Sequence, residues 1–338
     1  MVSASTPPRI SKIADAAGVS TATVSNALSG KGRVSAKTVE LVRATAKELG
    51  YFASPAGRAL RTGKSNVLGL VLPDISNPLF PQIAQAIGAA AGKAGYGVLI
   101  GDSRGDIHTQ TETIRRLLER GVDGMVVVPR RGSRVTEVAC PVAMIDTPST
   151  PGNTVAADHW QGGQQITAHL AKLGHRKVAL IANNPSSNVQ NDRVGGMRST
   201  PDLVTETIWT EKLRNRSMGL PRMLEQGFTA FATVSDLLAL RVLTELQKIG
   251  VHVPEDVSVT GFDDLVWASV ITPSLTTMRM NMTAIAEIAV EALAGAINSG
   301  ERRSLVQAAT QRVPMSLVVR QSSAPPPENK PSEGEQAI

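Results

Sequence analysis

The chain of 338 residues contains one cysteine, and aromatic side chains make up only 3% of it. A single cysteine excludes a disulfide within the chain and is typical of a protein from a reducing compartment. Cys140 lies in the apolar run Val138–Val142, so we expect it to pack in a core rather than act as a nucleophile. With so few aromatic rings, that core must consist mainly of Ala, Val, Leu and Ile.

Long apolar runs are also missing. The longest that we find, Val67–Leu72 and Gly124–Val128, are far shorter than the roughly 20 residues that span a bilayer. Residues 1–9 contain no apolar signal core. We therefore expect a soluble, cytoplasmic protein with no membrane partner.

Sequence signatures of enzymes are scarce. No GxGxxG motif follows a predicted strand, and Gly63–Ser65 lacks the earlier glycine of a phosphate loop because Arg58 occupies that position. The histidines, which show no metal-ligand spacing with cysteine, are His108, His159, His169, His175 and His252. The sequence predicts no enzyme, metal or cofactor, although a Ser–His–Asp set brought together only by folding stays open.

Positive charge is concentrated in the first fifth of the chain. Residues 1–64 hold ten basic and three acidic residues, a net charge of +7, whereas the whole chain carries +6 and residues 65–338 therefore sum to −1. A basic module attached to a nearly neutral body is typical of a protein that binds nucleic acid. A basic segment that is merely solvated is the alternative.

The basic region has the pattern of three short helices. We expect helices over Ile10–Ala17, Thr21–Leu28 and Ala36–Leu49. Gly18 breaks the first, Ser20 and Ser35 can cap the other two, and Gly50 supplies a left-handed stop. Two helices joined by a tight turn at Gly18 form a helix-turn-helix, in which the second helix lies in the major groove of DNA.

The second of these helices would carry the residues that read bases. Its outward positions are Thr21, Ala22, Ser25 and Asn26. The amide of Asn26 could pair with adenine, and the methyl group of Ala22 could contact a thymine methyl. The flanking cations Lys31, Arg33 and Lys37 are expected to lie near phosphates.

Residues 51–64 differ in character. Ser54 and Pro55 form a helix start, and the helical pattern ends near Arg61, before Gly63. About two turns are too few for an isolated helix to be stable. We predict a linker that becomes helical only when a partner is present.

From Asn66 onward, short apolar strands alternate with helices, which predicts parallel sheets in two lobes. The expected strands are Val67–Leu72, Gly97–Ile100, Met125–Val128, Val142–Ile145, Lys177–Ile181, Thr205–Trp209, Thr229–Val234 and Val257–Gly261. The expected helices are Pro78–Ala94, Ile107–Arg120, His159–Leu173, Lys212–Glu225, Asp236–Ile249 and Thr283–Asn298. Residues 321–338 lack core-forming side chains and are expected to be disordered.

These motifs together resemble the LacI/GalR family of bacterial repressors. The resemblance is carried by ISKIADAAGVSTATVSNALSGKGRVSAKTVELVRATAKELGYFASPAGRALRTGK and SNVLGLVLPDISNPLF, and continues through GHRKVALIA, NDRVGG, VPEDVSVTGFDDL and TPSLTTMR. It covers nearly all of residues 9–320. It implies a dimer with an all-α helix-turn-helix head, a hinge helix, and an α/β core like that of periplasmic binding proteins, built from two Rossmann-like subdomains with an effector between them.

The resemblance also implies the boundaries of these parts. The head is expected at 1–52, the hinge at 53–64, the effector-binding and dimerisation core at 65–320, and a disordered tail at 321–338. Within the core, the N-subdomain comprises about 65–158 and 281–308, and the C-subdomain comprises 159–280 and 309–320.

Site residues are carried over position by position. In the hinge run GRALR, Leu60 matches the leucine that wedges into the minor groove at the centre of the site, which kinks the duplex at the cost of a few kcal/mol of unstacking. The expected DNA contacts are Thr21, Ala22, Ser25, Asn26, Lys31, Arg33, Lys37, Pro55, Arg58 and Leu60. The expected effector contacts are Asp74, Phe80, Asp146, Arg193, Ser235 and Asp263.

Two positions depart from the family pattern. Ser235 stands where the family usually has asparagine, so one effector contact is shortened or lost. Pro201 should end the helix that contains Arg193 early. Asp236, which precedes a predicted helix, is expected to act as a cap.

The sequence and the family resemblance therefore predict a repressor that binds a palindromic operator and responds to a small molecule of the sugar, polyol or nucleoside class. Residues 321–338 contain no leucine, whereas tetramers in this family use a C-terminal leucine heptad segment, so we expect a dimer. The alternatives are an enzyme, a solute receptor, and a regulator whose core answers to a protein partner.

The wedge assignment is testable. Replacing Leu60 by Ala should weaken binding to the specific site far more than binding to random DNA, because only the specific complex contains the kinked central step. Affinities for both DNAs at one salt concentration measure this, and an equal loss on both would contradict the assignment.

Overall fold

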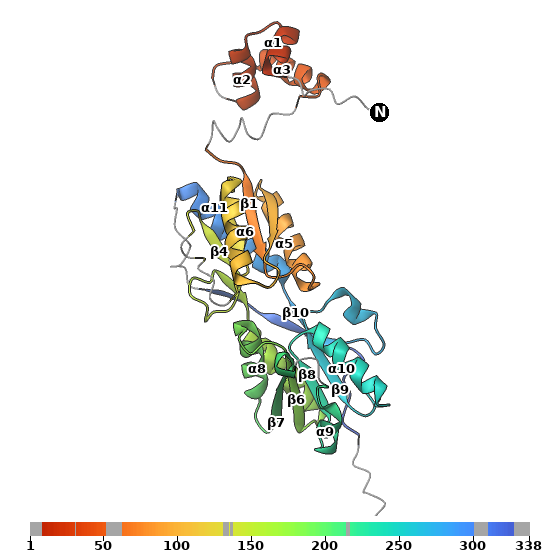
Figure 1. Ribbon diagram of the computed structural model, residues 1–338. Helices are drawn as coiled ribbons and strands as arrows, with labels where there is room; N and C mark the ends of the chain where they lie inside the picture. Colours follow the sequence, from red (N-terminus) through yellow and green to blue (C-terminus); the bar gives the residue numbers. More distant parts are fainter. Residues whose placement is uncertain are drawn as a thin grey trace, which may run out of the picture. The chain divides into compact units, whose positions relative to one another are not determined.

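The computed structural model describes residues 9–30, 32–51, 63–130, 135, 138–213, 217–300 and 310–327. The chain divides into two compact units, Met1–Ser65 and Asn66–Ile338. We call the first unit the head and the second the core (Figure 1).

The head consists of α1 (Ile10–Ala17), α2 (Thr21–Ser29) and α3 (Ala36–Glu48). As predicted, Gly18 ends α1 in the left-handed region at φ +65°, and Gly50 follows α3 at φ +63°. The hydroxyls of the two cap serines, Ser20 and Ser35, accept the backbone N–H three residues later at 3.1 and 3.2 Å. The three helices bury Ile13, Ala14, Val24, Ala27, Val42 and Ala46.

The first lobe of the core, the N-lobe, contains a parallel sheet in the order β2-β1-β3-β4. Its strands are β1 (Val67–Leu72), β2 (Gly97–Asp102), β3 (Gly124–Val127) and β4 (Val142–Met144). Helices α5 (Leu79–Lys93) and α11 (Met282–Ser299) pack on one face, and α6 (Ile107–Glu119) packs on the other.

The second lobe, the C-lobe, contains a sheet in the order β12-β10-β9-β8-β6-β7, in which only β12 is antiparallel to its neighbour. The strands are β6 (Lys177–Ala182), β7 (Val204–Trp209), β8 (Ala230–Thr233), β9 (Ser258–Phe262), β10 (Thr276–Met280) and β12 (Met315–Val318). Helices α7 (His159–Leu173) and α8 (Asn188–Arg198) cover one face, and α9 (Leu220–Glu225) and α10 (Asp236–Lys248) cover the other.

The two lobes share one apolar core. β5 (Val155–Ala157) and β11 (Gln311–Val313) pair in parallel as a separate two-stranded sheet, and each leads the chain from one lobe toward the other. One cluster of buried side chains runs from β1, α5 and α11 of the N-lobe to β6, α7 and α8 of the C-lobe. The lobes are thus neighbours joined by several chain segments, as Figure 1 shows.

Most predicted elements are present within two residues of their expected ends, but the helix expected over Lys212–Glu225 is wrong. A 3-10 turn occupies Thr210–Leu213, and α9 begins only at Leu220, with Pro221 in its first turn. Proline lacks a backbone N–H and is accepted at a helix start but not inside a helix. The same residue type ends α8 early as predicted, because that helix stops at Arg198, three residues before Pro201.

The prediction of disorder from residue 321 is also wrong for residues 321–327. Ser322 is completely buried, and its hydroxyl donates to the carbonyl of Val259 at 2.6 Å and accepts from the amide of Thr276 at 2.9 Å. The backbone of Ser322 bonds to Val259 and to Ser274. Composition missed this segment because hydrogen bonds to β9 and β10, rather than apolar side chains, hold it in place.

Helix α11 is long and apolar enough to cross a membrane by length and composition, with a mean hydropathy of 1.2. The sequence pattern predicts a helix over Thr283–Asn298 in this region. Its apolar side chains pack against α5, β3 and β4, and Ala289 and Leu293 are completely buried. Its composition therefore reflects burial within the N-lobe.

The buried hydroxyl of Ser322 should contribute measurably to stability. Replacing Ser322 by Ala leaves the Thr276 amide without its acceptor, so we expect the free energy of unfolding to fall by about 1–3 kcal/mol. Urea denaturation measures it. The control is Ser316→Ala at an exposed position on β12, which should change stability by no more than about 0.5 kcal/mol; equal effects would contradict this role.

Candidate DNA-reading surface and inter-lobe site

The outer face of α2 carries the residues that were predicted to read bases. Thr21, Ala22 and Asn26 are exposed, and Ser25 is half-buried. They are exposed because Val24 and Ala27, on the opposite face of the same helix, are completely buried in the head. This face presents small polar and methyl groups, the side chains that suit contact with base edges.

The loop after α2 shapes this surface. A Cβ atom on Gly32 would lie 3.1 Å from the amide nitrogen of Asn26, and Gly32 has φ +87°, so a glycine fits here best. Arg33 and Lys37 are exposed beside it. The other predicted DNA contacts, Lys31, Pro55, Arg58 and Leu60, lie outside the described residues.

In the C-lobe, the structure brings Arg193 and Asp263 together although they are 70 residues apart. Nη1 of Arg193 lies 3.0 Å from Oδ1 of Asp263, and about 4% of each side chain is exposed. Nη1 also donates to the carbonyl of Val234 at 2.6 Å, and the guanidinium lies 4.6 Å from the centre of the Phe262 ring. Nε of Arg193 donates to Nδ1 of His159 at 3.3 Å.

This arrangement fixes the charge state of its members. Burial and the neighbouring Arg193 charge hold the pKa of His159 well below its ordinary value, so its ring is neutral and can accept from Arg193. Burial raises the pKa of Asp263 to about 6, although Arg193 opposes that rise. Asp263 also adopts φ +107°, an uncommon backbone conformation for a residue other than glycine. Strained residues of this kind gather at ligand sites.

Ser235, rather than Asp236, caps α10. The hydroxyl of Ser235 accepts the N–H of Leu238 at 3.3 Å. Asp236 is completely buried instead, and its carboxylate accepts from the Thr277 hydroxyl at 2.6 Å and from the Leu265 amide at 2.7 Å. Asp236 therefore ties the loop that carries Asp263 to β10, and the expectation that it caps α10 is wrong.

The buried position of Asp236 next to Asp263 also changes its pKa. Burial, and then the negative charge of Asp263, raise the pKa of Asp236 to about 8. Gly261 makes room for the carboxylate, since a Cβ there would lie 2.2 Å from its Oδ1 atom. A second aspartate next to the strained loop, Asp264, is paired with both Arg279 and Arg320.

The N-lobe candidates lie at the carboxyl ends of β1 and β4. Asp74 accepts from the amide and hydroxyl of Ser76, and these bonds lower its pKa. Phe80, in the first turn of α5, packs on the shared core. Asp146 follows β4, and burial raises its pKa to about 6. Asp146 also interacts electrostatically with the C-lobe, because the negative charge of Asp192, beside Arg193 on α8, adds to the rise in its pKa.

Sequence reasoning missed several polar and aromatic groups of this region. His159 and Asp192 were not among the expected effector contacts, and neither was Arg130, whose positive charge helps to lower the pKa of Asp74. Trp209 ends β7 half-buried against the shared core. For Arg130 and Trp209, the available sequence signal was their position. Both stand at or just after the carboxyl ends of predicted strands, where ligands of parallel sheets bind.

Comparisons with known proteins identify the chain's relatives. A family profile described as "Bacterial regulatory proteins, lacI family" matches residues 9–54, and one described as "Periplasmic binding protein-like domain" matches residues 167–323. The HTH-type transcriptional regulator DegA of Bacillus subtilis is 31% identical, over 93% of this chain and 97% of DegA. The repressor CytR of Escherichia coli is 30% identical, over 77% of this chain and 81% of CytR. This chain belongs to the lacI family.

Solved structures support the same fold for this lacI-family chain. The Lac repressor dimer bound to operator and the anti-inducer ONPF is similar with a TM-score of 0.78 and 25% identity, over 94% of this chain and 100% of that one. The predictions of family and of fold class are thus confirmed. The relatives are named transcriptional regulators rather than enzymes, and this lacI-family member is a DNA-binding transcriptional regulator of the repressor type.

The Arg193–Asp263 pair generates a stability prediction. Asp263→Leu leaves the buried guanidinium uncompensated, so we expect the free energy of unfolding to fall by about 3–5 kcal/mol. Adding Arg193→Met should recover part of that loss, because the double variant buries no unpaired charge. Urea denaturation of the wild type, the two single variants and the double variant gives the four free energies of unfolding that this comparison needs. If the losses in the two single variants simply add in the double variant, the two side chains are not coupled and the prediction is refuted.

Proposed function

We propose that the protein represses transcription as a homodimer on a palindromic operator and that a small molecule bound between the lobes changes its affinity for DNA. The observation that carries this proposal is the face of α2, where Thr21, Ala22 and Asn26 are exposed on a head of net charge +7. Each head would read one half-site, with Asn26 bonding to a base edge and Arg33 and Lys37 near phosphates.

The proposal of a small-molecule effector rests on the inter-lobe site, by which we mean Arg193 and Asp263 of the C-lobe with Asp74 and Asp146 of the N-lobe. Arg193 offers donors and Asp263 offers acceptors at the carboxyl end of the C-lobe sheet, and Asp74 and Asp146 follow strands of the N-lobe sheet. Carboxylates and a guanidinium together suit a ligand rich in hydroxyl groups. The Lac repressor structure holds the anti-inducer ONPF together with operator. We therefore propose a sugar, polyol or nucleoside as the effector.

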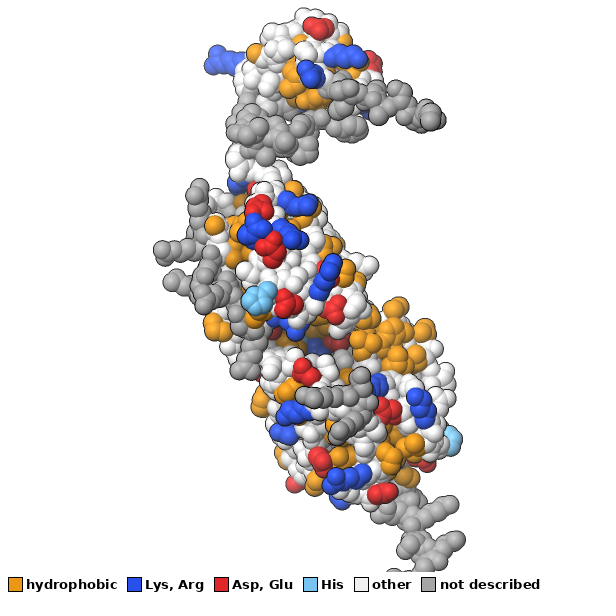
Figure 2. Space-filling model, viewed as in Figure 1, with side chains coloured by type: hydrophobic (Ala, Val, Ile, Leu, Met, Phe, Trp, Pro, Cys, Tyr) orange, Lys and Arg blue, Asp and Glu red, His pale blue; other side chains and the backbone are white. Residues whose placement is uncertain are grey.

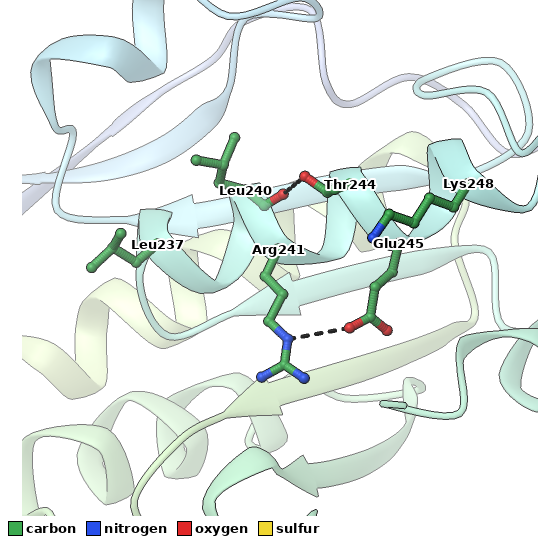
Figure 3. A pocket seen from close by; sticks show the side chains of 6 residues that line it. All are labelled: Leu237, Leu240, Arg241, Thr244, Glu245 and Lys248. Atoms are coloured by element: carbon green, nitrogen blue, oxygen red, sulfur yellow. Dashed lines mark hydrogen bonds and ion pairs between the residues drawn. The ribbon is translucent and has the colours of Figure 1, made fainter. Parts of the chain in front are cut away.

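The dimer is supported by exposed apolar side chains on the core. Leu237 and Leu240 on α10 are 41% and 37% exposed, and they line a groove of about 370 Å³ with Arg241, Thr244, Glu245 and Lys248 (Figure 3). Val266 and Val270, in the segment after β9, are 77% and 74% exposed. Figure 2 shows apolar side chains gathered on this part of the C-lobe. The Lac repressor named above is a dimer, so a second copy is the occupant we propose.

Sequencing of genomic fragments retained by the purified protein at physiological salt tests the function. We expect enrichment of a palindrome with a deformable central step, and the adjacent genes would indicate the class of effector. Asn26→Ala should relax the base preference at one position in each half-site, at a cost of about 1–3 kcal/mol. Absence of enrichment, both alone and with added sugars, polyols and nucleosides, would refute the proposal.

The same selection tests the dimer. Leu240→Asp places a charge at the centre of the proposed contact, so we expect a monomer by sedimentation and enrichment of half-sites only. The matched control is Val204→Asp at an apolar position on β7 that is also exposed; it should enrich the full palindrome. A Leu240→Asp protein that still sediments as a dimer would exclude this surface.

A further inference from the structure

The chain enters the core through a residue that is held from both sides. Asn66 directly precedes β1, which lies between β2 and β3 in the N-lobe sheet. Its carbonyl accepts from the amide of Gly97, the first residue of β2, at 2.9 Å. Its amide donates to Oδ2 of Asp123, the residue before β3, at 2.8 Å. Both backbone polar groups of Asn66 are thus bonded before the sheet begins.

The chain also bends at this residue. Asn66 has φ +53°, a left-handed conformation that asparagine adopts more readily than most side chains and that β-branched residues rarely adopt. A positive φ is incompatible with the extended backbone of a strand, so the direction in which residues 63–65 leave β1 is set at Asn66. The bond to Asp123 holds the amide of the residue that makes this bend.

Asp123 is itself held firmly in the N-lobe. Its amide donates to the carbonyl of Val67 at 2.8 Å. The next residue, Gly124, is packed so closely that a Cβ atom there would lie 2.9 Å from Cδ1 of Leu293 on α11 and 3.1 Å from the carbonyl oxygen of Pro141. The start of β3 therefore has little room to move, and Asp123 is an acceptor at a fixed position.

We propose that Asp123 fixes the point and direction at which the linker to the head, residues 51–64, leaves the core, and that it is thereby a positioning residue for specific DNA binding. Two heads that occupy two half-sites at a fixed spacing lose less freedom on binding when each linker starts from a fixed point. The effect on DNA binding rests on the function proposed above, whereas the anchoring of the linker does not.

Limited digestion of the full chain with trypsin measures the anchoring without DNA. Trypsin cleaves after Lys64, two residues before Asn66, and a protease cleaves such a bond from a locally opened chain. Asp123→Ala removes the acceptor of the Asn66 amide. We expect the initial rate of cleavage after Lys64 to rise about tenfold, as for loss of a partly exposed hydrogen bond to a charged group. Cleavage after Arg58, followed by mass spectrometry in the same digest, is the reference.

Two matched pairs of variants control this measurement. Asp123→Asn removes the same charge as Asp123→Ala but keeps an oxygen that can accept from Asn66, so its cleavage ratio should stay within about threefold of the wild type. The second pair leaves Asp123 unchanged. Asn66→Val disfavours the positive φ and should raise cleavage as Asp123→Ala does, whereas Asn66→Gly allows it and should behave as the wild type.

The consequence for DNA binding is measured on the operator obtained from the genomic selection and on random DNA, at one salt concentration. Compared with their matched controls, Asp123→Ala and Asn66→Val should bind the operator about three- to tenfold more weakly and bind random DNA equally well. The two members of each pair carry the same charge, so a difference between them does not come from long-range electrostatics.

Equal cleavage ratios in the Asp123→Ala and Asp123→Asn proteins would overturn the anchor; if Asp123→Ala does not fold, equal ratios in the Asn66 pair would do so. A raised cleavage ratio without a selective loss of operator binding would overturn the positioning role. If the selection yields no operator, the cleavage ratios still test the anchor, and that result counts against the proposed function alone.

Discussion

Arg193 carries a full positive charge at a position where about 4% of its side chain is exposed, and the arrangement of the C-lobe around it compensates that charge. A buried charge is tolerated only when it is paired and hydrogen-bonded. Asp263 supplies the opposite charge, the Val234 carbonyl and His159 accept hydrogen bonds, and the Phe262 ring lies against the guanidinium. Three separate segments of the C-lobe therefore converge on one side chain.

The same requirement explains the strained loop after β9. Asp263 leaves β9 at φ +107° and pairs with Arg193, and two neighbouring aspartates bond to or flank the same loop. Asp236 accepts the amide of Leu265, and Asp264 is paired with Arg279 and Arg320. Arg320 begins the C-terminal segment that Ser322 anchors, so the order of that segment and the geometry of the inter-lobe site are connected.

The folds of the head and of the core depend on different kinds of contact: local ones in the head and contacts between distant segments in the core. In the head, local signals suffice, because three short helices with serine caps and glycine stops enclose a small apolar core and leave the outer face of α2 exposed. In the core, two sheets meet so that loops from strand ends lie at the boundary of the lobes. Contacts across that boundary, such as Asn188 to Thr150, can then depend on the orientation of one lobe to the other.

The sequence by itself determined the elements whose signals are local. The caps Ser20 and Ser35, the stops at Gly18 and Gly50, and the alternation of strands and helices from Val67 onward depend only on neighbours along the chain. The family motifs also predicted Arg193 and Asp263 as effector contacts. Only the tertiary structure decided that these two pair with each other, that Ser235 rather than Asp236 caps α10, and that residues 321–327 are ordered. The Arg193–Asp263 pair, the burial of Asp236 against Thr277 and Leu265, and the order of 321–327 depend on atoms from distant segments. Composition and periodicity contain no information about which distant segment will supply the partner.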